Sequence, residues 1–520
     1  QVYGFNLVYS GNFLSQVEVS TFEMTRVMLG VHPEHFSYCL REGESFQTPE
    51  ALLAFSENGL NGLSHIFHHF MKNRLMHSKW KKEVRPILLN NWEATFFDFT
   101  EEKILQIAKK AKEVGAELFV LDDGWFGARN DDYLGLGDWE ANLTKLPNGI
   151  KGLSEKVEAM GLRFGLWFEL EMVNMDSDLY RAHPDWMIQT PGRFPSHARH
   201  QHVLDYSRSE VVDYIYEKVA KILRESKISY IKWDMNRYMS EPYSPSLPPE
   251  KQGEMMHRYI LGVYSLYYRL TQEFPDILIE SCASGGARFD AGLLYYAPQA
   301  WCSDDSDAGE RAKIQYGTSI AYPIVSIGAH VSAVPNQQVY RHTPLETRAN
   351  IAYFGTFGYE LDLNLLSEIE LAEVKREIAF MKEHRKLLQI EGDFYRLLSP
   401  FSGNECGFSV VSPEQTEAIA LYFQKLNFVN ASWIRFKLKG LSKEKFYRVK
   451  ANLDPSLERE AEAVLHAGFN LQKKSMNYVA SGAELMEIGI PIAREDLSRK
   501  GGDFASILFT LKEEAQEKDV

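Results

Sequence analysis

The sequence predicts an α/β protein in which a closed (β/α)₈ barrel follows a β-rich segment and precedes a C-terminal antiparallel β-sandwich. Three observations predict this fold class. Short apolar runs alternate with helical patterns about eight times in roughly 300 residues, which favours parallel strands joined by right-handed crossovers. These runs end, rather than begin, in Trp, Asp, Glu, Lys or Cys, as strands do at the active-site face of such barrels. Towards the C-terminus, short alternating strands replace the strand-and-helix pattern.

Three parts are expected along the chain: a β-rich segment with a helix over 1–85, the barrel over 86–391 and the sandwich over 392–520. In the first part, residues 2–9 and 13–19 alternate with period two on either side of a Ser-Gly-Asn turn. This alternation predicts two strands.

A helix is predicted over residues 60–75, where apolar and aromatic groups recur at helical spacing. His65, His68 and His69 lie on it. Because no cluster of carboxylates accompanies them, a surface or interface helix is favoured over a metal site.

The barrel strands are predicted from eight apolar runs, the last two with weaker patterns. In chain order they cover residues 86–92, 118–121, 163–169, 228–234, 277–282, 300–303, 322–329 and 351–356. Helices are expected from Thr100 and over 147–160, 210–225, 252–274 and 365–388. In the sandwich, strands are expected at 394–398, 407–411, 418–423 and 506–511.

The bulk composition is that of a globular protein of 520 residues, with 45% hydrophobic and 25% charged residues. A formal net charge of -14 argues against nucleic acid or an anionic membrane as a partner. Four widely spaced cysteines and the absence of a signal peptide or apolar span predict a cytoplasmic location. The chain begins with Gln1 rather than Met, so we expect it to be processed or incomplete there.

The fourth predicted strand ends in Lys232-Trp233-Asp234-Met235-Asn236-Arg237. Because side chains alternate along a strand, Lys232, Asp234 and Asn236 share one face and Trp233 takes the other. An ammonium and an amide on either side would keep a carboxylate charged and oriented, which suits a nucleophile. A structural salt bridge at the strand end explains this motif alone equally well.

The sixth predicted strand ends in three acids within four residues, Asp304, Asp305 and Asp307. One interpretation is a carboxylate cage for a divalent cation, although the spacing of an EF-hand loop is absent. The other is a glycosidase pair, in which one of these acids faces Asp234 across the barrel mouth. An acid beside an apolar group such as Trp301 would have a raised pKa and stay protonated.

Polar groups at other strand ends suit a ligand with many hydroxyls. Asp122 and Asp123 can accept hydrogen bonds from different hydroxyls, with Trp125 as a stacking wall, although a helix cap is the alternative. Arg199 can donate to a hydroxyl or to Asp234. After Cys282, Gly285 lets the backbone approach a ligand closely.

Five motifs, in the family's order, resemble α-galactosidases of glycoside hydrolase family 36. They are LDDGWF at 121–126, GLWFE at 165–169, KWDMNR at 232–237, ESCASGG at 280–286 and WCSDD at 301–305. The similarity covers essentially the whole chain. It implies a (β/α)₈ barrel, a C-terminal β-sandwich and a two-step retaining mechanism.

By that resemblance, Asp234 matches the nucleophile and Asp304 the general acid/base, with Asp305 the alternative if the motif is offset by one. Asp122 and Asp123 match the ligands of the galactose 4- and 6-hydroxyls. The rest of the galactose pocket is matched by Trp92, Trp167, Arg199, Lys232, Asn236, Cys282 and Gly285.

The chain departs from the family at its N-terminal end. Members carry a large N-terminal β-sandwich, and residues 1–85 match only its final strands and linker helix. In the tetrameric bacterial branch the missing part helps to build the oligomer and can cover a neighbour's pocket. The resemblance therefore leaves open whether this chain forms a homo-oligomer.

The expected function is hydrolysis of terminal non-reducing α-D-galactosyl residues from oligosaccharides of the melibiose or raffinose type, without cofactor or metal. A galactosyltransferase of the raffinose-synthase type and an α-N-acetylgalactosaminidase are the nearest alternatives. A sugar-binding protein with an inactive site and a metal-dependent hydrolase are alternatives from other classes. Product analysis, a chromogenic galactoside and a chelator distinguish these possibilities.

Overall fold

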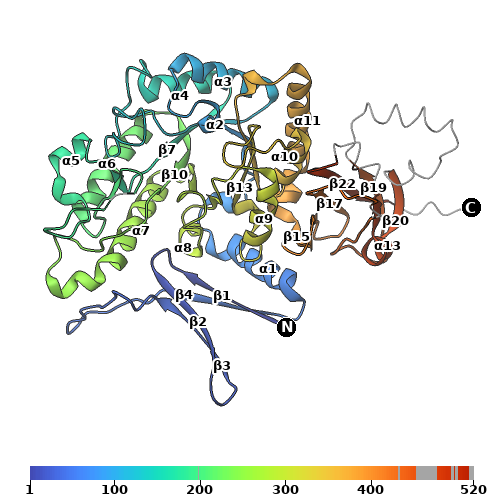
Figure 1. Ribbon diagram of the computed structural model, residues 1–520, viewed down its shortest axis with the longest axis horizontal. Coiled ribbons are helices and arrows are strands. Elements are labelled where there is room, and N and C mark those ends of the chain that lie inside the picture. Colours follow the sequence, from blue (N-terminus) through green and yellow to red (C-terminus); the bar gives the residue numbers. More distant parts are fainter. Residues whose placement is uncertain (197, 431–433, 452–476, 493–496, 498–501, 515–520) are drawn as a thin grey trace, which may run out of the picture. The chain divides into compact units, whose positions relative to one another are not determined.

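The computed structural model describes residues 1–196, 198–430, 434–451, 477–492, 497 and 502–514. Figure 1 shows the arrangement of its helices and strands. No helix among the described residues is long and apolar enough to cross a membrane.

Eight of the described strands close into a barrel. In chain order they are β5 (Leu88–Asn90), β6 (Leu118–Leu121), β7 (Arg163–Phe168), β10 (Ile228–Trp233), β11 (Leu278–Ser281), β12 (Gln299–Trp301), β13 (Ile327–Ser332) and β14 (Thr356–Glu360). Around the barrel the order is β10-β11-β12-β13-β14-β5-β6-β7. The pairs β5–β6, β6–β7, β7–β10, β10–β11 and β11–β12 are parallel. The predicted (β/α)₈ barrel is confirmed.

A helix follows each barrel strand along the chain. They are α3 (Glu101–Val114), α4 (Gly149–Ala159), α6 (Ser209–Glu225), α7 (Met255–Glu273), α8 (Ala291–Leu294), α9 (Ala308–Thr318), α10 (Leu345–Ala352) and α11 (Glu368–Arg385). Shorter elements lie in the loops: α2 (Trp92–Thr95), β8 (Met172–Val173), α5 (Asp178–Ala182) and β9 (His202–Val203). Caps fix both ends of α3. The Thr100 side chain accepts from the Lys103 N–H at the start of α3, and left-handed Gly115 ends that helix.

The first six predicted strands lie within three residues of the observed ones, but the last two predictions need correction. The seventh strand, expected at 322–329, is β13 at Ile327–Ser332, because Ile324–Ser326 form a 3₁₀ turn directly after Pro323. The prediction of a strand at 351–356 was wrong. Ile351 and Ala352 end the buried helix α10, and the strand begins only at Thr356. A short apolar run does not distinguish a buried helix from a buried strand.

Apolar side chains fill the barrel at the beginnings of its strands. Leu88, Leu118 and Leu278 are the first residues of their strands, and they pack with Val120 and Tyr230 in one buried cluster. Polar residues are therefore left for the opposite, carboxyl ends of the strands.

The N-terminal segment forms two small antiparallel sheets. β1 (Val2–Val8) pairs with β4 (Glu50–Ser56), and β2 (Phe13–Val19) pairs with β3 (Thr25–Val31) in a hairpin that extends away from them (Figure 1). The predicted helix at 60–75 is α1 (Gly59–Phe70), continued by a π-helical turn at Met71–Leu75.

The C-terminal part is antiparallel, as predicted. Its larger sheet has the order β15-β16-β17-β22-β19-β20, and β18 pairs with β21 beside it. The strands are β15 (Asp393–Leu398), β16 (Glu405–Val411), β17 (Glu417–Gln424), β18 (Ile434–Phe436), β19 (Phe446–Ala451), β20 (Asn477–Ser481), β21 (Ile490–Ile492) and β22 (Ala505–Glu513). Phe436 and Ile490 of the small sheet share a buried core with Tyr422 and Ile507 of the large one.

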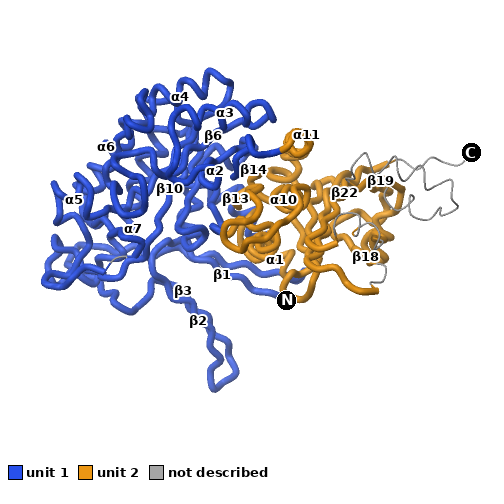
Figure 2. Tube along the Cα trace, turned by 45° about the horizontal axis from the view of Figure 1, so that its top comes forward, with its two compact units in different colours: residues 1–59, 66–304, 359–366 blue, residues 60–65, 305–358, 367–520 orange. Residues whose placement is uncertain are grey.

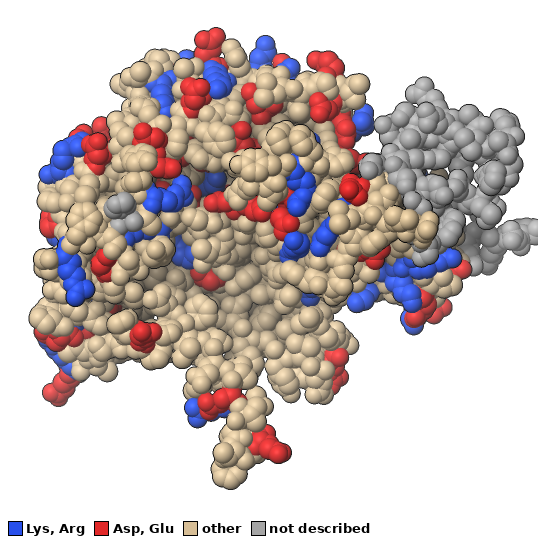
Figure 3. Space-filling view, viewed as in Figure 1, with Lys and Arg blue, Asp and Glu red and all other residues tan. Residues whose placement is uncertain are grey.

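Internal contacts divide the chain into two compact units, coloured in Figure 2. Unit 1 contains residues 1–59, 66–304 and 359–366, and unit 2 contains 60–65, 305–358 and 367–520. The three-part organisation with boundaries near 86 and 392 stays a prediction. On the face shown in Figure 3, acidic and basic side chains are interspersed among other residues.

Gly165 of β7 offers a test of the barrel packing. A Cβ atom there would lie 2.9 Å from a Tyr230 ring carbon and 3.0 Å from Val120. We expect Gly165→Ala to lower the free energy of unfolding by about 1–3 kcal/mol, as overpacking does. Gly30→Ala is the matched control, because no atom lies within 4 Å of the added Cβ. Thermal unfolding of both variants measures the effect, and equal melting temperatures would contradict this packing.

Candidate active site

The carboxyl end of β10 carries the first pair of charged groups. Lys232 Nζ lies 2.8 Å from Asp122 Oδ2, which follows β6, and both side chains are buried. Burial alone would lower the pKa of Lys232, but Asp122 and Glu360 outweigh it and raise that pKa well above its ordinary value. On the other face of β10, Trp233 stacks on Tyr267 of α7 with ring centroids 3.9 Å apart.

The end of β5 holds the Asp122 carboxylate from the other side. Asn90 Nδ2 donates to Asp122 Oδ2 at 2.7 Å, and the Asn91 side chain accepts from the Asp122 backbone N–H at 2.8 Å. Asn90 Oδ1 also accepts from the Trp92 N–H at 2.7 Å. The half-buried Trp92 and the charged pair are therefore fixed by one asparagine.

Asp234 is buried and is surrounded by hydrogen-bond donors rather than paired with a cation. Its Oδ2 accepts from Asn236 Nδ2 at 2.9 Å and from Trp167 Nε1 at 3.3 Å. Its Oδ1 accepts from the backbone N–H of Met235 at 2.8 Å and of Ser284 at 3.4 Å. Such donors orient a carboxylate without neutralising it.

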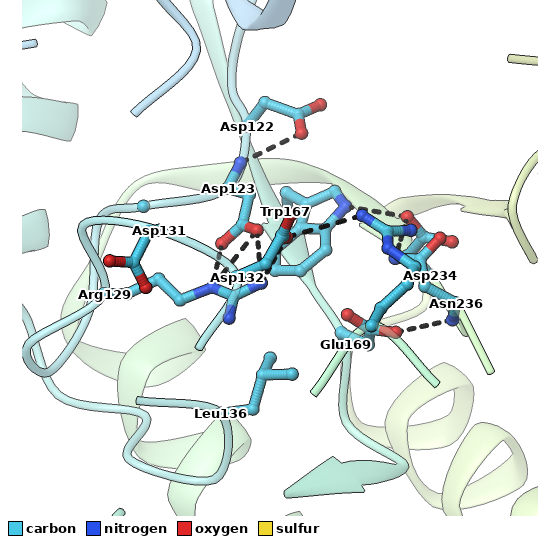
Figure 4. A network of polar contacts seen from close by, with 12 residues as sticks. Asp122, Asp123, Arg129, Asp131, Asp132, Leu136, Trp167, Glu169, Asp234 and Asn236 are labelled. Atoms are coloured by element: carbon cyan, nitrogen blue, oxygen red, sulfur yellow. Dashed lines mark hydrogen bonds and ion pairs between the residues drawn. The ribbon is translucent and has the colours of Figure 1, made fainter. Parts of the chain in front are cut away.

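Asp123 forms a second buried ion pair, with Arg129 in the loop after β6 (Figure 4). Arg129 Nη2 lies 2.9 Å from Asp123 Oδ2, and Nε donates to both oxygens at 3.1 and 3.2 Å. Burial raises the pKa of Asp123 and the guanidinium opposes that rise. We take this pair as charged at neutral pH, because three contacts join the guanidinium to the carboxylate.

Arg199 lies at the edge of this network. Its Nη2 is 3.5 Å from Asp132 Oδ1, the same oxygen that lies 3.5 Å from Arg129 Nη2. Arg199 and His200 both have positive φ, and the His200 ring lies 3.9 Å from the Tyr133 ring. Asp132, in the loop after β6, thus lies near both Arg129 and Arg199.

Asp304 follows β12, and Trp301 Nε1 donates to its Oδ1 at 3.1 Å. The side chain is exposed, yet the protein atoms around it exclude enough water to raise its pKa to about 6, with Asp234 adding to the rise and Lys232 opposing it. Asp305 differs: its Oδ1 accepts from the Asp307 N–H, and its carbonyl accepts from Arg311. Of the two acids, Asp304 is the one whose pKa is raised by the charge of Asp234.

The loop after β11 packs closely around both acids. The Cys282 thiol is buried, and burial raises its pKa well above the ordinary value, with Asp234 and Asp304 adding to the rise. Gly285 has φ +82°, and a Cβ there would lie 2.7 Å from the Asp304 backbone N. Position 285 therefore requires glycine for two reasons. The backbone there has a left-handed conformation, and it lies too close to the backbone of Asp304 to leave room for a side chain.

The structure brings the predicted site residues together through contacts among the barrel's loops. Three contributors were not predicted from the sequence: Asn90, Arg129 and Glu169. Asn90 lies in the predicted strand at 86–92, and Glu169 ends the GLWFE motif, so both could have been noticed as polar strand ends. No local pattern distinguishes Arg129, because its role depends on a loop that folds back onto Asp123.

His65 of α1 contacts residues of β15. His65 Nε2 lies 2.8 Å from the Phe394 carbonyl oxygen, and its ring contacts Tyr395. Over the described part of the chain, no group of three or more His, Cys, Asp or Glu side chains is placed to hold a metal ion.

Comparison with known proteins identifies the family. A family model described as melibiase matches residues 45–391. The N-terminal and C-terminal domain models of glycosyl hydrolase family 36 match residues 1–41 and 405–511.

Two curated relatives are similar over most of the chain. Alpha-galactosidase AgaA of Geobacillus stearothermophilus is 53% identical over 86% of this chain and 62% of its own length. Alpha-galactosidase 1 of Pediococcus pentosaceus is 44% identical over 97% of this chain and 66% of its own length. The chain thus spans a little under two thirds of the curated relatives that it matches.

A solved structure has the same fold. The crystal structure of an AgaA variant from Geobacillus stearothermophilus in complex with raffinose has a TM-score of 0.91 at 48% identity. The match covers 98% of this chain and 67% of that one. From the three matching family models and these relatives, the chain belongs to glycosyl hydrolase family 36.

Proposed function

We propose that the protein is a retaining α-galactosidase that releases terminal non-reducing α-D-galactose from oligosaccharides of the raffinose or melibiose type. The observation that carries the proposal is the contrast between two neighbouring carboxyl groups. Asp234 accepts hydrogen bonds from four donors, whereas Asp304 has a pKa raised to about 6. One carboxylate and one acid with different environments are what double displacement requires. The raffinose bound to the AgaA variant supports the substrate class.

In the first step, an oxygen of Asp234 attacks the anomeric carbon. The bond from that carbon to the leaving sugar breaks, and the proton of Asp304 passes to the leaving oxygen. The attacking carboxylate is aimed by Trp167 and Asn236, which both hold Oδ2.

In the second step, Asp304 acts as a base. It removes a proton from water, the water oxygen bonds to the anomeric carbon, and the ester bond to Asp234 breaks. Galactose leaves with its original anomeric configuration, and Asp304 is protonated again.

The buried ion pairs fit the role of hydroxyl ligands. Lys232 and Arg129 hold Asp122 and Asp123 as carboxylates, so each keeps lone pairs for a sugar hydroxyl. Trp92 supplies an aromatic surface beside them. We assign the remaining contacts of the sugar to Arg199, Cys282 and the backbone at Gly285.

A cytoplasmic location and a homo-oligomer belong to the same proposal. All four cysteines are free, which favours a reducing compartment. The β2–β3 hairpin exposes five large apolar side chains, which favours burial against another surface. They are Phe13, Val17, Val19, Phe22 and Met24.

The nucleophile is tested by Asp234→Asn. The amide keeps the size of the carboxylate but cannot form the glycosyl-enzyme bond, so we expect kcat on a nitrophenyl α-galactoside to fall at least about a thousandfold. Circular dichroism and thermal unfolding check that the variant is folded. Turnover close to that of the wild type in a folded variant would exclude Asp234 as the nucleophile.

The acid/base is tested by Asp304→Asn, with Asp305→Asn as the matched control. Because Asp304 must be protonated to assist departure, kcat/KM for melibiose should fall as pH rises through about 6, where that acid ionises. Asp304→Asn should remove this pH dependence and lose about 10²–10⁴-fold in kcat/KM for melibiose. For an activated aryl galactoside, whose leaving group needs no proton, the loss should be smaller.

Asp305→Asn should keep both the pH dependence and most of the activity. If Asp305→Asn loses activity in this pattern while Asp304→Asn does not, the two assignments must be exchanged.

A further inference from the structure

Glu169 lies directly after β7 and is fully buried. Its Oε1 accepts a hydrogen bond from the Asn236 backbone N–H (Figure 4). Its Oε2 is buried and has no hydrogen-bond partner among the described residues. A carboxyl oxygen in that position is removed from water without any compensating donor.

Glu169 is linked to Asp234 through a single residue. The Asn236 peptide N–H is held by Glu169, and the Asn236 side-chain amide donates to Asp234 Oδ2 at 2.9 Å. The remaining Asn236 oxygen accepts from the Ser284 hydroxyl at 3.0 Å. Glu169 therefore fixes the stretch of backbone from which Asn236 reaches Asp234.

Two charged groups face Glu169 across this site, Asp234 after β10 and Arg129 in the loop after β6. Arg129 gives its closest contacts to Asp123 rather than to Glu169. Burial raises the pKa of Glu169 to about 8, and Asp234 adds to the rise while Arg129 opposes it. At neutral pH Glu169 is thus a neutral acid beside a carboxylate.

We propose that Glu169 is a positioning residue for the reaction: through the Asn236 peptide it fixes the amide that orients Asp234, and it does so without placing a second negative charge there. The inference rests on the proposed α-galactosidase activity. Charge on Glu169 would repel Asp234 and compete with Asp123 for Arg129, so that both the nucleophile and a hydroxyl ligand lose their alignment.

The test measures kcat/KM between pH 5 and 10 with a dinitrophenyl α-galactoside. Its leaving group departs without a proton, so ionisation of Asp304 does not lower kcat/KM for this substrate. A group that ionises at higher pH can therefore be detected. For the wild type we expect a fall above about pH 8, where Glu169 ionises. Glu169→Gln keeps an acceptor for the Asn236 N–H and cannot ionise. It should stay within about threefold of the wild type at pH 7 and lose the alkaline fall.

Two further variants separate positioning from general stability. Glu169→Met has similar length but no acceptor, so kcat at pH 7 should fall about a hundredfold while KM changes little. Asp290→Asn is the matched control, since Asp290 is another acid with a raised pKa, held by Ser10 outside this network. It should keep the wild-type pH profile.

The inference would be overturned if Glu169→Gln showed the same alkaline fall as the wild type. It would also be overturned if Glu169→Gln were inactive, or Glu169→Met fully active, at an unchanged melting temperature. No turnover of any α-galactoside by the wild type would instead reject the proposed function itself.

Discussion

The site depends on how buried charge is balanced at the carboxyl ends of β6, β7 and β10. Among the charged groups buried there, four carboxyl groups and two cations form the network around Asp234, each at most 7% exposed. They are Asp122, Asp123, Glu169, Asp234, Lys232 and Arg129. Because an isolated charge is costly to bury, two cations can neutralise only two of the four acids. The other two acids avoid an uncompensated pair of charges in different ways. Asp234 is held by hydrogen-bond donors, and Glu169 is protonated.

Under the proposed function, this balance gives each acid a separate task. Asp122 and Asp123 pair with Lys232 and Arg129 and remain acceptors for a ligand. Asp234 is held by neutral donors rather than by a cation, which leaves it free to react. Asp304 stands outside the set, exposed beside Trp301, where its pKa of about 6 lets it both give and take a proton. The chemistry follows from environment, since all four of these acids are aspartates of ordinary intrinsic reactivity.

The barrel and the sandwich could be predicted because their signals are local, and the acids at the strand ends could be singled out as candidates for the same reason. The apolar runs at 118–121 and 163–169 and the acids that follow them lie within a few residues of each other. The eighth strand was misplaced because Ile351 and Ala352 are buried in a helix, and burial removes the periodicity that separates helix from strand. Arg129 could not be predicted, because its contact with Asp123 depends on loop geometry.

The central claim is that Asp234 is the one buried carboxylate left free to react with the sugar. Trapping with a 2-deoxy-2-fluoro α-galactosyl donor, followed by mass spectrometry of the digested protein, tests it most directly. The account predicts one added fluorosugar per chain, attached to the peptide that carries Asp234 and located at that residue. A label on Asp304, Glu169 or Asp123 would contradict it.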